Sequence, residues 1–140
     1  MFLKLSISKK LLLSVSIFFI SFSGFNCTSV PAEDLYGKWN YVKIESSDKE
    51  DPDSVTHSEL QLQRPSIEFT KPDSLKIFWG GKILSRGNFR MDNKMIRYTE
   101  ILGENRVREF PFLIIEISPE TLVFETMEAK NTRITAVKSN

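Results

Sequence analysis

The sequence predicts an all-β protein, an antiparallel up-and-down barrel of eight strands that is preceded by a signal peptide. From residue 35 onward, short runs alternate apolar and polar residues, and Gly, Pro, Asn and Asp separate these runs. The turns recur about every 8–12 residues, which is typical of an antiparallel sandwich or barrel. No segment beyond the N-terminal stretch has helical periodicity. A barrel is favoured because closure removes the exposed strand edges that invite aggregation.

Residues 1–26 have the composition of an export signal. Lys9 and Lys10 precede Leu11–Phe25, in which ten of fifteen residues are Leu, Val, Ile or Phe. A basic start, a short apolar core and a small-residue exit describe a secretory signal peptide. A stable membrane span needs about 20 apolar residues, so this stretch is marginal as a permanent anchor. We therefore assign 1–26 to a signal peptide.

Cys27, the single cysteine, directly follows the apolar core. Leu11–Cys27 resembles a bacterial lipoprotein signal, which implies that Cys27 carries acyl chains such as palmitate and becomes the first mature residue. The preceding Gly24-Phe25-Asn26 departs from the usual aliphatic and small residues. The alternative is an ordinary cleaved signal that leaves Cys27 as a free thiol. Acylation would hold the domain on a membrane, since each buried CH₂ contributes about 0.8 kcal/mol.

Residues 27–34 read as a short polar tether that includes one proline. Thr28 stands where an acidic residue would retain some lipoproteins at the inner membrane. The expected location is therefore the cell envelope, lipid-anchored, at the outer membrane. Whether the domain faces the periplasm or the outside is left open by the sequence.

The first half of the barrel domain, 35–140, begins with a strand at Gly37–Glu45. Trp39 and Tyr41 share one face of this strand, whereas Val42 and Ile44 lie on the other, which predicts a bulge near Tyr41. Further strands follow at Ser66–Thr70 and Leu75–Trp79, separated by a turn with Pro and Asp. A Gly-Gly pair then closes the next hairpin.

The second half continues the same pattern. The expected strands are Lys82–Met91, Lys94–Leu102, Arg106–Ser118, Thr121–Met127 and Thr132–Lys138. Asp-Asn, Gly-Glu-Asn, Pro-Glu and a four-residue turn separate them in that order, and each of these supplies residues that favour turns.

Ser46–Pro65 is the one long connection. It starts with four acidic residues and becomes mildly amphipathic near Leu60, where a short helix at Val55–Leu62 fits the pattern. A loop of this length in a compact domain often serves as a lid or a binding loop.

A family resemblance rests on the order of several short motifs. Gly37-Lys38-Trp39 resembles the Gly-x-Trp start of the lipocalin group, and the closing hairpin at 117–125 is similar to small bacterial lipocalin-like lipoproteins. The resemblance covers nearly all of Leu35–Lys138. It implies a barrel in which Gly37 permits a close approach and Trp39 plugs the closed end beneath a late basic residue. Arg133, at the start of the last strand, is the residue expected to supply that cation–π contact.

The expected barrel has a predominantly aromatic interior. An eight-stranded barrel can be filled by side chains or hold one small ligand. One aromatic residue from each of six strands is a candidate for lining such a cavity: Phe69, Trp79, Phe89, Tyr98, Phe112 and Phe124. The alternative is that they form an ordinary core.

Phe110–Ile115 is apolar on both faces, whereas a strand with one wet face should alternate. A second surface should therefore cover this strand, and the candidates are the loop, the tether, a partner protein or the membrane. Pro111 within it indicates a bulge or a break in pairing.

Composition excludes several classes of site. The whole chain has 19 Lys and Arg against 18 Asp and Glu, and without residues 1–26 it has 16 against 18, which argues against a nucleic acid partner. His57 has no second histidine or cysteine nearby, so it is expected to be a solvated loop residue rather than a metal ligand. The acidic group at 48–53 lacks the glycine of a calcium loop. The scattered glutamates read as an outward polar face, so we expect no catalytic residues, metal or cofactor.

Two functional hypotheses remain. The first is a membrane-tethered barrel that binds a small apolar or amphipathic molecule without catalysis. The second is an envelope interaction module without a ligand, which contacts a partner protein through the apolar strand Phe110–Ile115 or the open mouth. A cavity with inward Trp79 and Tyr98 would favour the first, and a filled barrel with an exposed apolar patch would favour the second.

Overall fold

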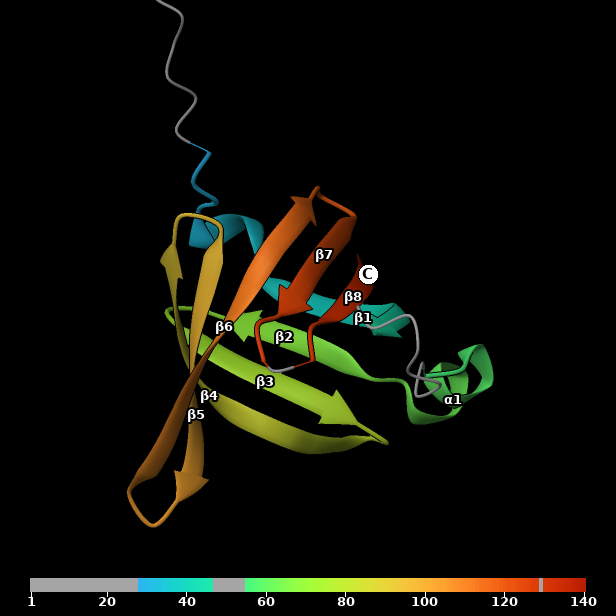
Figure 1. Cartoon of the computed structure of the whole chain (residues 1–140), viewed down its shortest axis with the longest axis horizontal. Helices are drawn as coiled ribbons and strands as arrows, with labels where there is room; N and C mark the ends of the chain where they lie inside the picture. Colours follow the sequence, from blue (N-terminus) through green and yellow to red (C-terminus); the bar gives the residue numbers. More distant parts are fainter. Residues whose placement is uncertain (1–27, 47–54, 129) are drawn as a thin grey trace, which may run out of the picture.

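The fold is an eight-stranded antiparallel barrel, seen in a computed structural model that describes residues 28–46, 55–128 and 130–140 (Figure 1). The predicted fold class is confirmed. The strands are β1 (Gly37–Ser46), β2 (Ser66–Thr70), β3 (Ser74–Trp79), β4 (Lys82–Asp92), β5 (Met95–Gly103), β6 (Arg106–Ile117), β7 (Thr121–Thr126) and β8 (Thr132–Lys138). A 3₁₀ turn, η1, spans Ala32–Asp34, and one short helix, α1, spans His57–Gln63. The expected signal peptide and Cys27 lie outside the described residues.

Each strand pairs with the next in sequence, and β8 closes the barrel against β1. The closing register pairs Trp39 with Lys138 and runs to Ser46 opposite Thr132. It shifts between Tyr41 and Lys43, which confirms the bulge that the first strand predicted. The bulge leaves Val42 exposed and returns Ile44 to the side that packs against the core.

The described part of the long loop contains the short helix. The side chain of Thr56 accepts a hydrogen bond from the Glu59 N–H (3.2 Å) and so caps the N-terminus of α1. Leu60 faces the core, and the carbonyl of Gln63 accepts a hydrogen bond from Gly80 N–H (2.7 Å) at the β3–β4 turn. The loop residues 47–54 lie outside the described chain. Among the described residues, no helix is long and apolar enough to cross a membrane.

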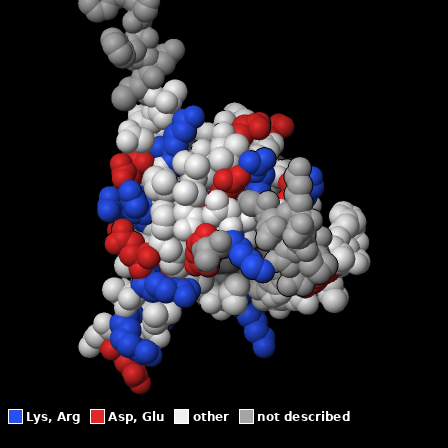
Figure 2. All heavy atoms as spheres, in the orientation of Figure 1, with Lys and Arg blue, Asp and Glu red and all other residues white. Residues whose placement is uncertain are grey.

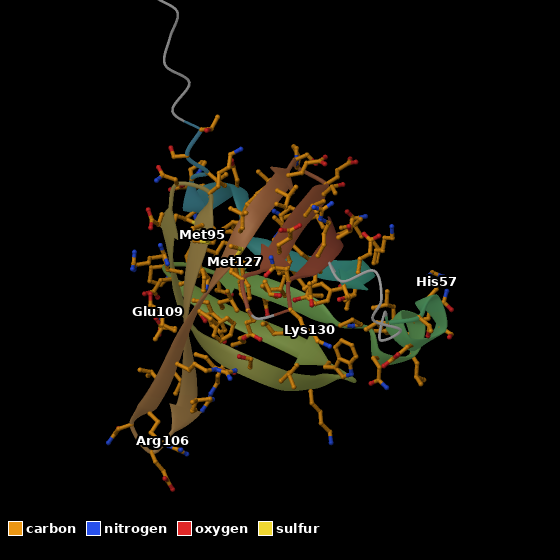
Figure 3. All side chains as sticks on the ribbon, viewed as in Figure 1. His57, Met95, Arg106, Glu109, Met127 and Lys130 are labelled. Carbon is orange, nitrogen blue, oxygen red and sulfur yellow. The ribbon has the colours of Figure 1, made fainter. Side chains whose placement is uncertain are left out.

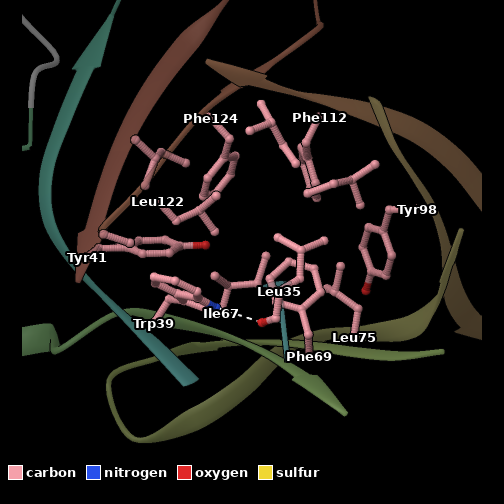
Figure 4. Close-up of a cluster of buried hydrophobic side chains, with 14 of the residues drawn as sticks. Leu35, Trp39, Tyr41, Ile67, Phe69, Leu75, Tyr98, Phe112, Leu122 and Phe124 are labelled. Carbon is pink, nitrogen blue, oxygen red and sulfur yellow. Dashed lines mark hydrogen bonds between the residues drawn. The ribbon is translucent and has the colours of Figure 1, made fainter. Parts of the chain in front are cut away.

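The interior is filled by side chains from all eight strands and from Leu35 (Figure 4). Trp39, Ile67, Leu75, Tyr98 and Leu122 are fully buried there. Alternation along each strand produces this, because successive side chains point to opposite faces of the wall.

Gly87 lies where β4 and β5 approach each other closely enough to exclude a Cβ. It pairs with Glu100, the last pair of the β4–β5 ladder on that side. A Cβ at Gly87 would collide with the carbonyl oxygen of Thr99 on β5. Only glycine therefore allows the two backbones to approach this closely.

We expect Gly87→Ala to lower the free energy of unfolding by roughly 1–3 kcal/mol, because the added methyl group forces β4 and β5 apart. Urea unfolding followed by tryptophan fluorescence measures this loss. Arg90→Ala is the matched control on the same strand, since its contact with Glu109 (3.6 Å) joins two exposed side chains and should contribute less than about 0.5 kcal/mol. Equal stabilities of the two variants would contradict the close approach at Gly87.

Candidate functional site

The closed end of the barrel is plugged by Trp39, as expected, but the cation above it is Lys138. The Trp39 indole Nε1 donates to the Leu35 carbonyl (2.8 Å). Lys138 Nζ lies 4.5 Å from the Trp39 ring centroid and donates to the Tyr36 carbonyl (2.6 Å). Gly37 makes room for this lysine, because a Cβ there would lie 2.8 Å from Lys138 Cε.

Arg133 does not reach Trp39, which corrects the sequence prediction. Its guanidinium forms an ion pair with Glu125 (2.6 Å), at the other end of β8. The reason is the direction of the strand. Because β8 runs antiparallel to β1, the end of β8 and not its start lies beside Trp39.

Five of the six predicted lining residues lie in the core and pack against one another. Ring centroids are 5.1 Å apart for Phe69 and Phe89, 5.8 Å for Tyr98 and Phe112, and 5.4 Å for Phe112 and Phe124. Trp79, at the end of β3, is only partly buried. These five rings therefore pack in the core as two groups, Phe69 with Phe89, and Phe112 with Tyr98 and Phe124.

Tyr41 presents a hydroxyl to the interior. Its ring packs edge-on against Phe124 (6.1 Å between centroids), and the hydroxyl points between the walls (Figure 4). No hydrogen bond joins the Tyr41 hydroxyl to another described residue. Among the described residues, every side-chain nitrogen or oxygen that is fully shielded from solvent has a hydrogen-bond partner. The hydroxyl therefore borders a space that water can reach. Burial raises the pKa of Tyr41 above its ordinary value, and Tyr98 adds to this rise.

A polar network lines the opposite end of the barrel from the plug. Ser85 Oγ lies 2.7 Å from the Tyr98 hydroxyl and donates to Glu100 Oε1 (2.5 Å). Arg108 pairs with the other carboxylate oxygen of Glu100 (2.8 Å). Glu100 is only 8% exposed, so both oxygens of a nearly buried charge are satisfied. Burial raises the pKa of Tyr98, and the negative charge of Glu100 adds to this, while Ser85 and Arg108 oppose it.

Beyond this network the barrel wall divides. The β4–β5 ladder ends at Gly87 and Glu100, but β4 continues back to Lys82 and β5 continues to Gly103. From there β4 pairs only with β3, and β5 pairs only with β6. We call this opening the β4/β5 split. It contains a hollow of about 390 Å³. The residues around the hollow are Ile83, Leu84, Ser85, Arg86, Glu100, Ile101 and Leu102.

The rim of the split is apolar and basic. Exposed large apolar side chains gather there from three strands: Ile83, Leu84, Ile101, Leu102 and Val107. Leu84 is 65% exposed and Val107 is 63% exposed. The β5–β6 hairpin projects past the other strands and carries charged side chains along its length (Figures 1 and 2). These exposed apolar side chains therefore lie beside the hollow rather than in the core.

The split lies at the opposite end of β5 from the tether. Val30 N–H donates to the Asn93 carbonyl (3.0 Å) at the β4–β5 turn, next to Met95. Figure 3 shows Met95 and Arg106 far apart along the β5–β6 hairpin. The first and last of the nine residues of β5 are about 26 Å apart, at about 3.3 Å for each step along the strand.

Phe110–Ile115 is less open than its composition suggests. Phe112 and Ile114 are buried, and only Ile115 of this strand segment is clearly exposed. On the outer face, Leu113 shares a hollow of about 560 Å³ with Met95 and Thr28 of the tether, and Val30 packs against the core. Pro111 lies just outside the β6–β7 ladder, because the first pair of that ladder is Phe112 with Thr126.

The remaining candidates stand apart from the split. His57 lies on exposed α1, where its Nε2 is 3.0 Å from Gln61 Nε2 (Figure 3). No three His, Cys, Asp or Glu side chains of the described chain are grouped so that they could hold a metal ion. No protein-family model and no curated protein matches the sequence.

The residues that form the split were not predicted as a site. Ser85, Glu100 and Arg108 carry no motif. A signal did exist, since β4 and β5 each hold an Ile-Leu pair at the split, Ile83-Leu84 and Ile101-Leu102. Such a pair places an apolar residue on both faces of a strand, as in Phe110–Ile115.

We expect Lys138→Met to lower the free energy of unfolding by roughly 1–3 kcal/mol, because it removes both the cation above Trp39 and the bond to Tyr36. Arg133→Met should cost at most about 1 kcal/mol, since its ion pair is half exposed. Urea unfolding of both variants makes the comparison. A larger loss for Arg133→Met would contradict the role of Lys138 in the plug.

Proposed function

We propose that this protein is a membrane-tethered, lipocalin-like interaction module of the cell envelope that captures a partner protein at the β4/β5 split and performs no catalysis. The observation that carries this proposal is the group of five exposed apolar side chains at the split. Four of them, Ile83, Leu84, Ile101 and Leu102, line a hollow at one end of a barrel whose core contains packed aromatic rings. An exposed apolar group outside this core favours contact with a partner.

The position of the split supports a partner that is not the anchoring membrane. The tether meets the barrel at the β4–β5 turn, and the split lies at the far end of the same two strands. Acyl chains on Cys27, only one residue before the described chain begins, would hold the turn near the lipid surface. The split would then face away from the membrane, toward other proteins of the envelope, with the outer membrane as the favoured site of attachment.

The chemistry of the hollow supports binding without catalysis. Glu100 is the single carboxylate among the residues that line it, and Ser85 and Arg108 engage both of its oxygens. Acid–base hydrolysis of the glycosidase kind uses two carboxylates across a cleft. The lining of the hollow includes one carboxylate, Glu100, and this carboxylate is already bound by Ser85 and Arg108.

A second candidate function is capture of a small amphipathic molecule inside the barrel, and the Tyr41 hydroxyl is the observation that favours it. This group borders water-accessible space and has no protein partner among the described residues. A polar group of a ligand could accept its hydrogen bond.

The proposed function predicts a contact at Leu84. A photo-crosslinking residue at position 84 of the full chain, in its host's membranes, should join one partner, and the same residue at position 42 should not. That partner, identified by mass spectrometry and purified, should bind the Leu84→Glu variant at least tenfold more weakly than the native protein. Val42→Glu is the control, because Val42 is also an exposed apolar strand residue, on β1. Equal affinities of the two variants would contradict capture at the split.

Native mass spectrometry of the protein extracted gently from its host's membrane tests both the anchor and the second candidate. Acyl chains should add covalent mass that survives denaturation and disappears in Cys27→Ser. A non-covalent adduct of a few hundred daltons, lost on denaturation and weakened in Tyr41→Phe, would support the second candidate. A protein that carries only its acyl chains would rule out tight carriage, and an unmodified Cys27 would refute the lipid anchor.

A further inference from the structure

The β4/β5 split contains two strand edges that no neighbouring strand pairs with, and across it, within the described chain, only the Ser85 side chain of β4 bonds to β5, at Tyr98 and Glu100. On the β4 side, Lys82–Arg86 extends five residues past the last pair of the ladder, Gly87 and Glu100. On the β5 side, Ile101–Gly103 extends three residues past it. Among the described residues, no strand pairs with either segment on the side that faces the split. A strand edge in this state is a template for another extended chain.

Three basic side chains at these edges have no ion-pair partner in the described chain. They are Lys82 and Arg86 of β4 and Arg106 of β6. By contrast, Arg90, Arg97, Arg108 and Arg133 each pair with a carboxylate. The one free carboxylate close by is Glu104, at the tip of the β5–β6 hairpin. The split is therefore positively charged beside its apolar surface.

We propose that the split binds an extended, acidic segment of a partner protein, which adds to the β4 edge Lys82–Arg86 as a further strand. This inference rests on the proposed function and names the kind of segment that the site takes. Main-chain hydrogen bonds to the β4 edge would provide affinity, as in other cases of strand addition. Carboxylates of the segment would meet Lys82 and Arg86 of the same edge.

Apolar side chains of the segment would pack on both sides of the added strand. Leu84 and Leu102 are both exposed, and each lies where the register of its strand shifts, Leu84 against β3 and Leu102 against β6. A segment of about five residues matches the length of the free β4 edge. It would have apolar residues on both faces in its centre and carboxylates at its flanks.

The same charges argue against a second copy of this chain as the occupant. Pairing two β4 edges would bring Lys82 and Arg86 of each copy together, and like charges directly opposite one another destabilise a strand pair. The basic residues thus keep the edge from pairing with itself and leave it available to an acidic strand.

The experiment uses the full chain, solubilised in detergent from its host's membranes, and two synthetic probe peptides. One is an acidic strand-forming peptide, Ac-EIVVIE-NH₂ with a fluorescent label, and the other is its basic counterpart, Ac-KIVVIK-NH₂. Fluorescence anisotropy gives both affinities. The acidic peptide should bind at least tenfold more tightly than the basic one, and methylation of its alternate backbone nitrogens should reduce binding at least tenfold. Deuterium exchange should slow in residues 82–86 when the acidic peptide is bound.

Two protein variants locate the effect. Arg86→Glu should weaken binding of the acidic peptide at least tenfold. Lys94→Glu makes the same change of charge at the β4–β5 turn, at the opposite end of β4, and should leave the affinity unchanged. Equal binding of the acidic and basic peptides, or binding that backbone methylation leaves unaffected, would overturn the inference.

The failure of this inference is distinguishable from the failure of the proposed function. If a partner crosslinks at position 84 and depends on Leu84, but the peptides show neither charge preference nor sensitivity to methylation, then capture at the split stands and acidic strand addition is wrong. If neither the partner nor the peptides depend on Leu84 or Arg86, both are wrong.

Discussion

Pairing of β8 with β1 is the interaction on which the rest of the structure depends. It converts a run of hairpins into a closed wall, so that each strand has a neighbour on both sides. The same pairing brings Lys138 to Trp39 and Tyr36, which plugs one end. Closure also fixes a narrow interior, and eight short strands leave little room beyond their own inward side chains. Aromatic rings fill most of that room here.

Aromatic rings pack in the core, whereas several large apolar side chains are exposed at the rim. Gly87 allows β4 and β5 to approach closely at the last pair of their ladder, and beyond it the two strands follow different neighbours. The wall therefore opens beside Glu100. The bonds from Ser85 and Arg108 offset the free-energy cost of placing a carboxylate there. The split, the polar network and the exposed Ile-Leu pairs all lie at or beyond this last pair.

Much of this architecture could be predicted from local patterns. Turn residues and alternation located all eight strands, and the change of face after Tyr41 located the bulge. The cation above Trp39 was predicted wrongly as Arg133, although antiparallel order already places the end of the last strand beside the start of the first. The split could not be predicted in this way, because it depends on where the β4–β5 ladder ends. Alternation within one strand does not show how many of its residues pair with a neighbouring strand. The six aromatic residues were candidates for lining a cavity if their side chains faced inward. Five of their rings instead contact other aromatic rings in the core.

The most direct test of the central claim, that the split is the contact surface, is amide hydrogen exchange of the protein in its own membranes compared with the purified protein. If the split is the contact surface, residues 82–86 and 101–103 exchange slowly in the membranes and rapidly after purification, because a partner covers these edges only in the envelope. The β1–β8 ladder should exchange at the same rate in both. Equally rapid exchange of the split segments in both preparations would contradict the account.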